Sequence, residues 1–173
     1  MRIISSEELY SGKFRAVKDI LETQEGKRFV HETIEHPGAV VILPIYPDGR
    51  IAFIEQYRHS VRRHLLELPA GTLESGEDPA VCAQRELMEE IGMASRDLMP
   101  LGTLLPAPGF CSEIQHIFCA RDLVEKKATP DDDEVITVVP MALSEVEGAI
   151  RDGVLIDGKS LAVVYQARVR GIL

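Results

Sequence analysis

The sequence predicts an α+β domain, an α/β/α sandwich in which a mixed β-sheet lies between helices, together with a small N-terminal antiparallel sheet. Short alternating or wholly apolar segments, typical of strands, precede a helical segment at residues 79–91. Further strand-like segments follow that helix, and two more helical segments come near the C-terminus. Strands, a helix, strands again and then helices within 173 residues are typical of an α+β domain with one core.

Residues 1–37 form the first of two expected parts of the chain. Alternating segments with a turn at residues 25–27 predict two or three short strands. The region has few residues that could build a core of its own. We therefore expect a small sheet that packs on the main domain, residues 38–173, or on a second subunit.

The main domain begins with two apolar runs, residues 39–45 and 51–55, separated by a Pro-Asp-Gly turn. Turn residues between apolar runs predict a hairpin in the core. The other expected elements are strands at residues 98–105, 114–120 and 135–139, a rigid turn at 106–110, a helix with Ser144 as N-cap, a capping box completed by Glu147 and an end near Gly153, and a last helix at 159–170.

The helix at residues 79–91 has two different faces. Asp78 fits its N-cap, Pro79 its first position and Gly92 a left-handed stop. At about 100° per residue, apolar residues gather on one side and carboxylates on the other. The apolar side consists of Ala80, Ala83, Leu87 and Ile91, and the acidic side of Glu86, Glu89 and Glu90.

Local helix physics does not favour these carboxylates. Glu86 and Glu90 are like charges at i,i+4, which costs roughly a few tenths of a kcal/mol, and the C-terminal half of a helix disfavours anions. A divalent cation would reverse the effect, because hard Mg²⁺ binds carboxylate oxygens and leaves positions for water and phosphate. Arg85 could hold one carboxylate in place. Taken alone, the pattern R-E-x-x-E-E is as often a solvated acidic face.

Composition argues against several classes of protein. A formal net charge of −9 disfavours nonspecific nucleic-acid binding, which depends on Lys and Arg. No apolar run approaches the roughly 18 residues of a membrane span and the N-terminus lacks a signal-peptide pattern, so we expect a cytoplasmic protein. Three cysteines without C-x-x-C spacing argue against disulfides and zinc. Cys82 falls on the acidic face, where carboxylates would raise its pKa, so we expect no nucleophile there.

The residues around the acidic helix resemble the Nudix box, and no position departs from it. Five residues separate the first two fixed positions and seven separate the next two. The fixed positions are Gly71, Glu77, Arg85, Glu86, Leu87, Glu89, Glu90, Gly92 and Met93. The resemblance implies an enzyme that hydrolyses a nucleoside diphosphate linked to another group, with Mg²⁺ as the metal and Mn²⁺ as a substitute.

Segments outside the box resemble the ADP-ribose pyrophosphatase branch of the Nudix family. These segments are residues 55–58, 66–70, 106–110 with Glu113, and 130–134, so the similarity spans about residues 30 to 140. GDP-mannose hydrolases of the same family share much of this pattern. The resemblance implies a homodimer whose N-terminal strands are exchanged between subunits.

The resemblance also implies roles for individual residues. The implied metal ligands are the Ala70 carbonyl, Glu86, Glu90 and Glu134. The implied catalytic residues, which would move a proton or orient water, are Glu89, Asp132 and Glu113. The family usually has Glu where this chain has Asp132, which is one methylene shorter.

Substrate contacts are implied for a further set of residues. Arg58 would hold phosphate, because its planar fork of donors suits that task, although it could also be a structural ion-pair partner. An arginine common in the family is replaced by His31 or His36. Phe14 would stack on adenine from the partner subunit or simply pack on its own sheet. The implied substrate-binding residues are Arg58, Glu32, His36, Thr72, Ala107, Gly109 and Phe14.

The expected reaction is Mg²⁺-dependent hydrolysis of ADP-ribose to AMP and ribose 5-phosphate. One alternative is hydrolysis of another nucleoside diphosphate sugar such as GDP-mannose. A second is a nucleotide sensor that keeps the fold without turnover, against which the complete set of box carboxylates argues. We expect neither nucleic acid nor a membrane as a partner.

Overall fold

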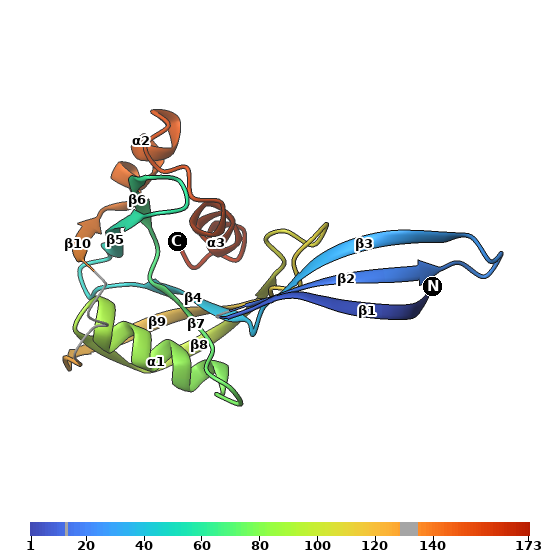
Figure 1. The fold of residues 1–173 in the computed structure, drawn as a ribbon. Coiled ribbons are helices and arrows are strands. Elements are labelled where there is room, and N and C mark those ends of the chain that lie inside the picture. Colours follow the sequence, from blue (N-terminus) through green and yellow to red (C-terminus); the bar gives the residue numbers. More distant parts are fainter. Residues whose placement is uncertain (13, 129–134) are drawn as a thin grey trace.

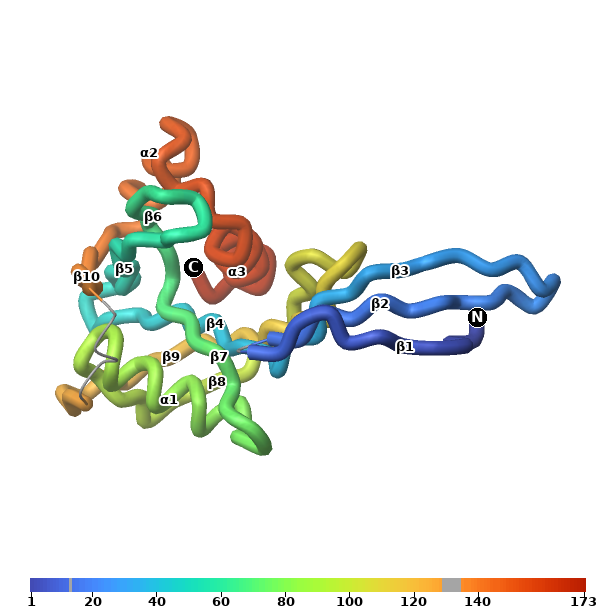
Figure 2. Tube along the Cα trace, in the orientation of Figure 1, coloured from blue at the N-terminus to red at the C-terminus, as the bar shows by residue number. Residues whose placement is uncertain are grey.

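The N-terminal residues fold into an antiparallel sheet that extends away from the rest of the protein (Figures 1 and 2). The computed structural model describes residues 1–12, 14–128 and 135–173. Residues 1–12 and 14–35 form three strands in the order β1 (Arg2–Ser11), β2 (Arg15–Glu22) and β3 (Arg28–Glu35). Gly26 sits at the β2–β3 turn with a φ of +81°. The expected N-terminal sheet and its turn are therefore present.

A mixed sheet forms the centre of the main domain. Its strands lie in the order β7 (Ala70–Thr72), β4 (Ala39–Pro44), β9 (Gln115–Glu125) and β8 (Met93–Leu104). β4 runs parallel to β9, and the two outer pairs are antiparallel. All six residues of β4 are buried, because this strand has neighbours on both edges and elements packed on both faces.

The prediction that residues 39–45 and 51–55 form a hairpin is wrong. β5 (Ile51–Arg58) belongs to a different sheet, where it lies between β10 (Ile136–Met141) and β6 (Arg63–Glu67). The turn at residues 46–50 does reverse the chain, but only the isolated bridge between Ile45 and Ile51 joins the two segments. Both strands have other neighbours on each edge, so neither has an edge left for a hairpin.

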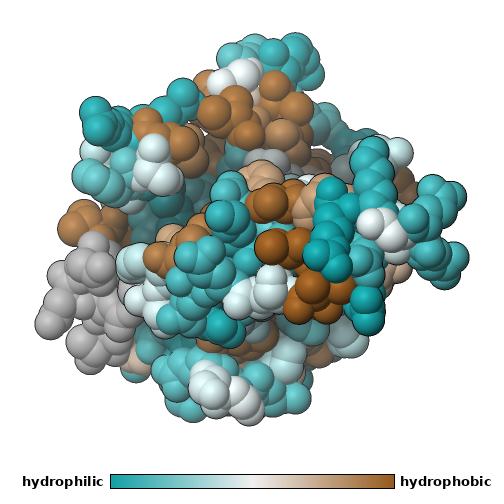
Figure 3. All heavy atoms as spheres, turned by 45° about the vertical axis from the view of Figure 1, so that its right-hand side comes forward, coloured by the Kyte–Doolittle hydropathy of each residue, from teal (hydrophilic) through white to brown (hydrophobic). Residues whose placement is uncertain are grey.

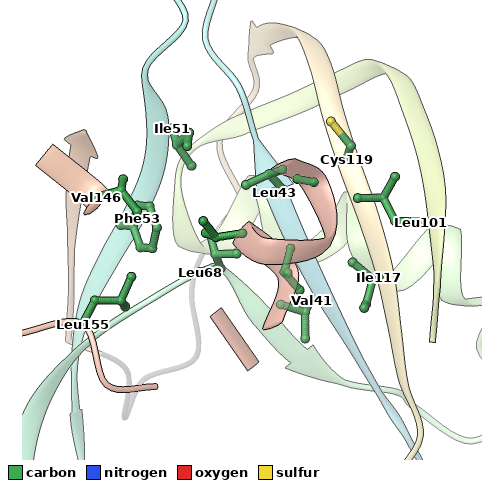
Figure 4. Close-up of a cluster of buried hydrophobic side chains, with 13 residues drawn as sticks. Val41, Leu43, Ile51, Phe53, Leu68, Leu101, Ile117, Cys119, Val146 and Leu155 are labelled. Carbon is green, nitrogen blue, oxygen red and sulfur yellow. The ribbon is translucent and has the colours of Figure 1, made fainter. Parts of the chain in front are cut away.

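Helices cover both faces of the mixed sheet. α1 (Pro79–Glu90) packs through Ala83 and Leu87 against Val40 and Ile42 on one face. α2 (Leu143–Arg151) and α3 (Gly158–Val169) contribute to the core on the other face, which includes Val41, Leu43, Ile117, Val146, Val163 and Ala167 (Figure 4). This arrangement confirms the α+β class with a mixed sheet between helices.

Three predicted boundaries need correction. β9, expected at residues 114–120, continues to Glu125. β8 begins at Met93, directly after the helix stop Gly92, because its pairing with β9 continues to Glu125. α2 has Ala142 as N-cap, not Ser144, and the Glu145 carboxylate accepts a hydrogen bond from the Ala142 N–H at 2.6 Å. Glu147 points elsewhere and pairs with Arg168 of α3. The last helix agrees with its predicted range within one residue.

Within the described part of the chain, no helix combines the length and the apolar character needed to cross a membrane.

Candidate active site

The ends of α1 are fixed by the residues that the sequence indicated. The Asp78 side chain accepts hydrogen bonds from the N–H groups of Ala80 at 2.8 Å and Val81 at 3.4 Å, which caps the helix. Gly92 follows the helix with a φ of +68°. Ala83 and Leu87 are fully buried, so the predicted apolar face is the one that packs on the sheet.

The acidic face of α1 is not a solvated surface. Glu86 is 7% exposed and Glu90 is 5% exposed, whereas the side chain of Glu89 keeps 22% of its accessible surface. The Glu90 carboxylate accepts a hydrogen bond from the Ala70 N–H at 3.0 Å, so the helix and β7 meet at these two residues. Burying two carboxylates this close together is unfavourable without positive charge nearby.

Gly71 makes room for Glu86. A Cβ atom at Gly71 would lie 1.8 Å from Oε1 of Glu86 and 1.9 Å from its Cδ, far inside van der Waals contact. Any side chain at this position would therefore displace the carboxylate. The need for a glycine at the first position of the box follows directly from this close approach.

Arg85 holds the loop before α1 and two of the carboxylates together. Its Nε donates to Glu77 at 3.1 Å, and its Nη1 donates to Glu86 at 2.7 Å and to Glu89 at 3.0 Å. Its Nη2 reaches the Thr72 carbonyl at 3.3 Å. These bonds raise the pKa of Arg85 and lower that of Glu77, so both stay charged. The prediction that Arg85 holds a carboxylate is confirmed.

The oxygen atoms at this end of α1 suit a hard divalent cation. Buried Glu86 and Glu90, the partly exposed Glu89 and the adjoining residue Ala70 offer carboxylate and carbonyl oxygens, which are the ligands that hard divalent cations prefer. Within residues 1–12, 14–128 and 135–173, no group of three or more His, Cys, Asp or Glu side chains could hold a metal by itself. A cation here would keep positions for water, substrate or further protein oxygens. The predicted residues Asp132 and Glu134 lie outside the described residues.

A pocket of about 420 Å³ opens beside these carboxylates, within the usual size range of ligand sites. It is lined by Pro37, Arg58, Ala70, Gly71, Thr72, Leu73, Glu74, Arg85, Glu86 and Glu89. Five of the predicted catalytic, metal-binding and substrate-binding residues therefore meet at one place: Arg58, Ala70, Thr72, Glu86 and Glu89.

Arg58 is an ion-pair partner of Glu67 and also lines the pocket. Its Nε and Nη2 donate to the two carboxylate oxygens of Glu67, each at 2.8 Å, and this pairing raises the pKa of Arg58. Arg58 is thus a structural ion-pair partner. It also lines the pocket, and its Nη1 has no hydrogen bond to any described residue. That nitrogen is available for a phosphate oxygen.

Sequence reasoning missed Glu67 as part of the site. Glu67 is 1% exposed at the end of β6 and is paired with Arg58 and Lys159. The signal was present in the sequence, since a glutamate within the apolar run Leu65–Leu68 needs a charged partner once the strand is buried.

One predicted catalytic residue, Glu113, and several predicted substrate contacts do not line this pocket within one chain. Glu113 accepts a hydrogen bond from the Gln115 amide at 2.9 Å. His36 accepts one from the Gly38 N–H at 3.1 Å. The Ala107 carbonyl accepts from two N–H groups in the turn that also contains Gly109. The hydrogen bonds of Glu113, His36 and Ala107 are therefore local and stabilise the segments in which these residues lie.

The two predicted contacts on the N-terminal sheet also lie outside the pocket lining of one chain. Glu32 is exposed on β3, opposite Lys18 of β2. Phe14 is 41% exposed, with its ring centroid 5.4 Å from that of Tyr10. The packing role considered for Phe14 is therefore present within its own sheet.

Cys82 lies next to the carboxylates of α1, as expected, because Arg85, which binds Glu86, also donates to the Cys82 sulfur at 3.3 Å. It is fully buried in the core beside Ala83 and Leu87, because its side chain turns toward the Thr72 carbonyl and the sheet. Burial, with help from nearby carboxylates, raises the pKa of Cys82 to about 12. The thiol therefore stays protonated, in line with the expectation that it is no nucleophile.

Comparison with known proteins shows the family of this chain. The model of the NUDIX domain family matches residues 35–162, so the chain belongs to the Nudix family. It is 33% identical to the ADP-ribose pyrophosphatase of Bacillus subtilis, with 99% of this chain and 95% of that protein covered. It is also 33% identical to the methanol dehydrogenase activator of Bacillus methanolicus, with the same coverage, 99% and 95%.

Two further similarities are informative about substrate and fold. The GDP-mannose pyrophosphatase of Yersinia enterocolitica is 34% identical, with 79% of this chain and 75% of that protein covered. A solved structure described as an ADP compounds hydrolase superposes with a TM-score of 0.85 at 26% identity, covering 96% of this chain and 91% of the other. The predicted Nudix fold is thus confirmed.

Proposed function

We propose that this protein hydrolyses the pyrophosphate bond of ADP-ribose to give AMP and ribose 5-phosphate, with Mg²⁺ as its metal and Mn²⁺ as a substitute. The observation that carries the proposal is the meeting of Glu86, Glu89 and the Ala70 backbone with Arg58 around one pocket. Buried carboxylates and an available guanidinium nitrogen are complementary to a metal-bound diphosphate. The adenosine and ribose parts follow the substrate in the name of the Bacillus subtilis relative.

In this proposal Glu86, Glu90, the Ala70 carbonyl and Glu134 hold the metal. When bound, a divalent cation neutralises charge on phosphate oxygens and lowers the pKa of a bound water. Arg85 fixes the orientation of Glu86 through the 2.7 Å hydrogen bond, so this carboxylate needs little rearrangement when substrate binds. Gly71 leaves the space in which Glu86 lies.

Glu89 is the first candidate for taking the proton of the attacking water. It lines the pocket, keeps part of its surface accessible and is oriented by the 3.0 Å hydrogen bond from Arg85. Asp132 and Glu113 remain the other candidates, and Glu113 is held by Gln115, the first residue of β9. Arg58 would bind a phosphate oxygen through Nη1.

We also propose a homodimer in which residues 1–37 exchange strands with a second subunit. All ten residues of β1 are exposed, and apolar side chains on this sheet, including Ile3, Leu9 and Tyr10, are more than half exposed. Figure 3 shows apolar residues gathered among hydrophilic ones where this side of the molecule comes forward. A partner sheet would cover them and bring Phe14 and Glu32 to the neighbouring pocket.

All three cysteines are free, as is usual for proteins in a reducing compartment. We therefore propose that the protein is cytoplasmic.

The decisive experiment measures AMP and ribose 5-phosphate released from ADP-ribose, with added Mg²⁺ and with EDTA. We expect equal amounts of the two products and no release in EDTA. A panel with GDP-mannose and ADP-glucose ranks substrates by kcat/KM. Intact ADP-ribose after long incubation with Mg²⁺, combined with tight binding of ADP-ribose, would favour the sensor alternative.

A further inference from the structure

A buried charge network connects the C-terminal helix to the proposed phosphate site. At its centre is Glu67, which is 1% exposed. Glu67 accepts two hydrogen bonds from Arg58 at 2.8 Å and a third from Lys159, which also pairs with Asp157 at 3.1 Å. The side chains of Lys159 and Asp157 retain only 13% and 14% of their accessible surface. An ion pair this buried interacts more strongly than one on the surface.

The same turn of α3 holds the backbone that leads to the proposed metal ligand. Asp157 caps α3 and accepts from the Ser160 N–H at 3.0 Å and the Ser160 hydroxyl at 2.6 Å. The Ser160 hydroxyl in turn accepts a hydrogen bond from the Leu68 N–H at 2.7 Å. Leu68 stands two residues before Ala70, whose N–H is bonded to Glu90. The first turn of α3 therefore binds both Glu67, the partner of Arg58, and the segment from Leu68 to Ala70.

The formal charges of the network cancel. Arg58 and Lys159 are positive, and Glu67 and Asp157 are negative. Without Lys159, the group would carry one net negative charge beside a pocket already lined by Glu86 and Glu89. Glu67 would also lose one of its two cationic partners and would attract Arg58 more strongly. Arg58 would then bind an anion in the pocket more weakly.

We propose that Lys159 is a positioning residue for diphosphate binding. Lys159 fixes the position of Glu67, which binds Nε and Nη2 of Arg58 and leaves Nη1 for the substrate. The positive charge of Lys159 also keeps the network neutral. The inference rests on the proposed phosphate role of Arg58. It adds a residue of α3 that is outside the lining of the proposed substrate pocket and belongs to none of the motifs described above.

The test uses charge variants that keep the cap of α3. Lys159→Met leaves the network one charge negative, and Asp157→Asn leaves it one charge positive while keeping a good N-cap. The double variant Asp157→Asn with Lys159→Met is neutral again. Lys159→Arg keeps the positive charge. Lys27→Met, in the exposed β2–β3 turn, is the matched control for loss of a lysine.

We expect Lys159→Met to raise KM for ADP-ribose roughly tenfold with kcat within about twofold, because one positive charge near the phosphate site is lost. Asp157→Asn should lower KM several-fold. The double variant should return to within about threefold of the wild type, as should Lys159→Arg. A double variant as impaired as Lys159→Met, or an unchanged KM in Lys159→Met, overturns the proposal.

A second readout does not depend on turnover. Because Arg58 is held in a bidentate pair, its Nε–H should give a slowly exchanging signal in ¹H–¹⁵N spectra, assigned by its loss in Arg58→Lys. Lys159→Met should shift or broaden this signal and weaken the binding of Mg²⁺-ADP, whereas Lys27→Met should do neither. If the wild type does not hydrolyse ADP-ribose, the proposed reaction is wrong. The Arg58 signal and the binding of Mg²⁺-ADP then test the role of Lys159 by themselves. An unchanged Arg58 signal with unchanged ADP binding refutes the role of Lys159.

Discussion

Replacing Gly71 with alanine tests the close approach on which the site depends. The new Cβ would lie 1.8 Å from Oε1, 1.9 Å from Cδ and 2.6 Å from Cγ of Glu86. Carbon atoms prefer separations of about 3.5–4.0 Å, so the whole carboxylate must swing away. No left-handed backbone is needed at Gly71, so the effect of alanine there is purely steric.

Displacing Glu86 should lower the stability of the protein moderately and the rate of hydrolysis strongly. Moving Glu86 breaks its 2.7 Å bond with Arg85 and strains local packing, which should lower the free energy of unfolding by about 1–3 kcal/mol, or Tm by roughly 3–10 °C. Loss of a metal-binding carboxylate should lower kcat by about 100-fold or more, the scale seen when one preorganised electrostatic group is removed. The protein should therefore remain folded but nearly inactive.

Three assays separate these effects. Circular dichroism checks the fold, a thermal melt with and without Mg²⁺ measures metal binding, and AMP release measures turnover. Gly148→Ala is the matched control, because a Cβ there meets nothing within 4 Å and alanine favours the helix, so activity should not change. A Gly71→Ala variant with wild-type kcat and an unchanged Mg²⁺-dependent melt would refute the steric reasoning.

Four further outcomes follow from the structure. Glu90→Gln should lower kcat by about 100-fold or more in the ADP-ribose assay without changing the circular dichroism spectrum; near wild-type turnover would remove the metal assignment. Arg58→Ala should mainly raise KM, and an unchanged KM would count against phosphate binding. Asp78→Ala should lower the free energy of unfolding by about 1 kcal/mol in urea melts, since the cap of α1 is lost. Cys82, with its pKa raised to about 12, should resist a thiol reagent at pH 8 in the folded state while the half-buried Cys111 reacts; equal labelling would contradict the burial.

The sequence predicted those parts of the fold that local physics determines. Asp78, Pro79 and Gly92 bound α1 because capping and backbone conformation are properties of a few neighbouring residues. The pairing of β4 and β5 could not be found this way. A Pro-Asp-Gly turn reverses the chain, but which strands become neighbours depends on distant segments such as β9 and β10.

The same distinction holds within the site. Glu86 and Glu89 meet as predicted because helical spacing places them on one side of α1. The Arg58, Glu67 and Lys159 network spans more than ninety residues of sequence, so no local pattern identifies which residues pair with Glu67. Phe14 and Glu32 do not line the pocket of a single chain, so the substrate contacts proposed for them depend on the proposed second subunit.

The central claim is that the carboxylates of α1 hold divalent cations against a diphosphate. Anomalous scattering from a crystal grown with Mn²⁺ and a non-hydrolysable ADP-ribose analogue measures this directly. We predict Mn²⁺ bound by Glu86, Glu90 and the Ala70 carbonyl, at about the 2.0–2.2 Å typical of small divalent cations with oxygen ligands, and in contact with the analogue's phosphates. Analogue bound in the pocket with no anomalous peak beside Glu86 or Glu90 would contradict the claim.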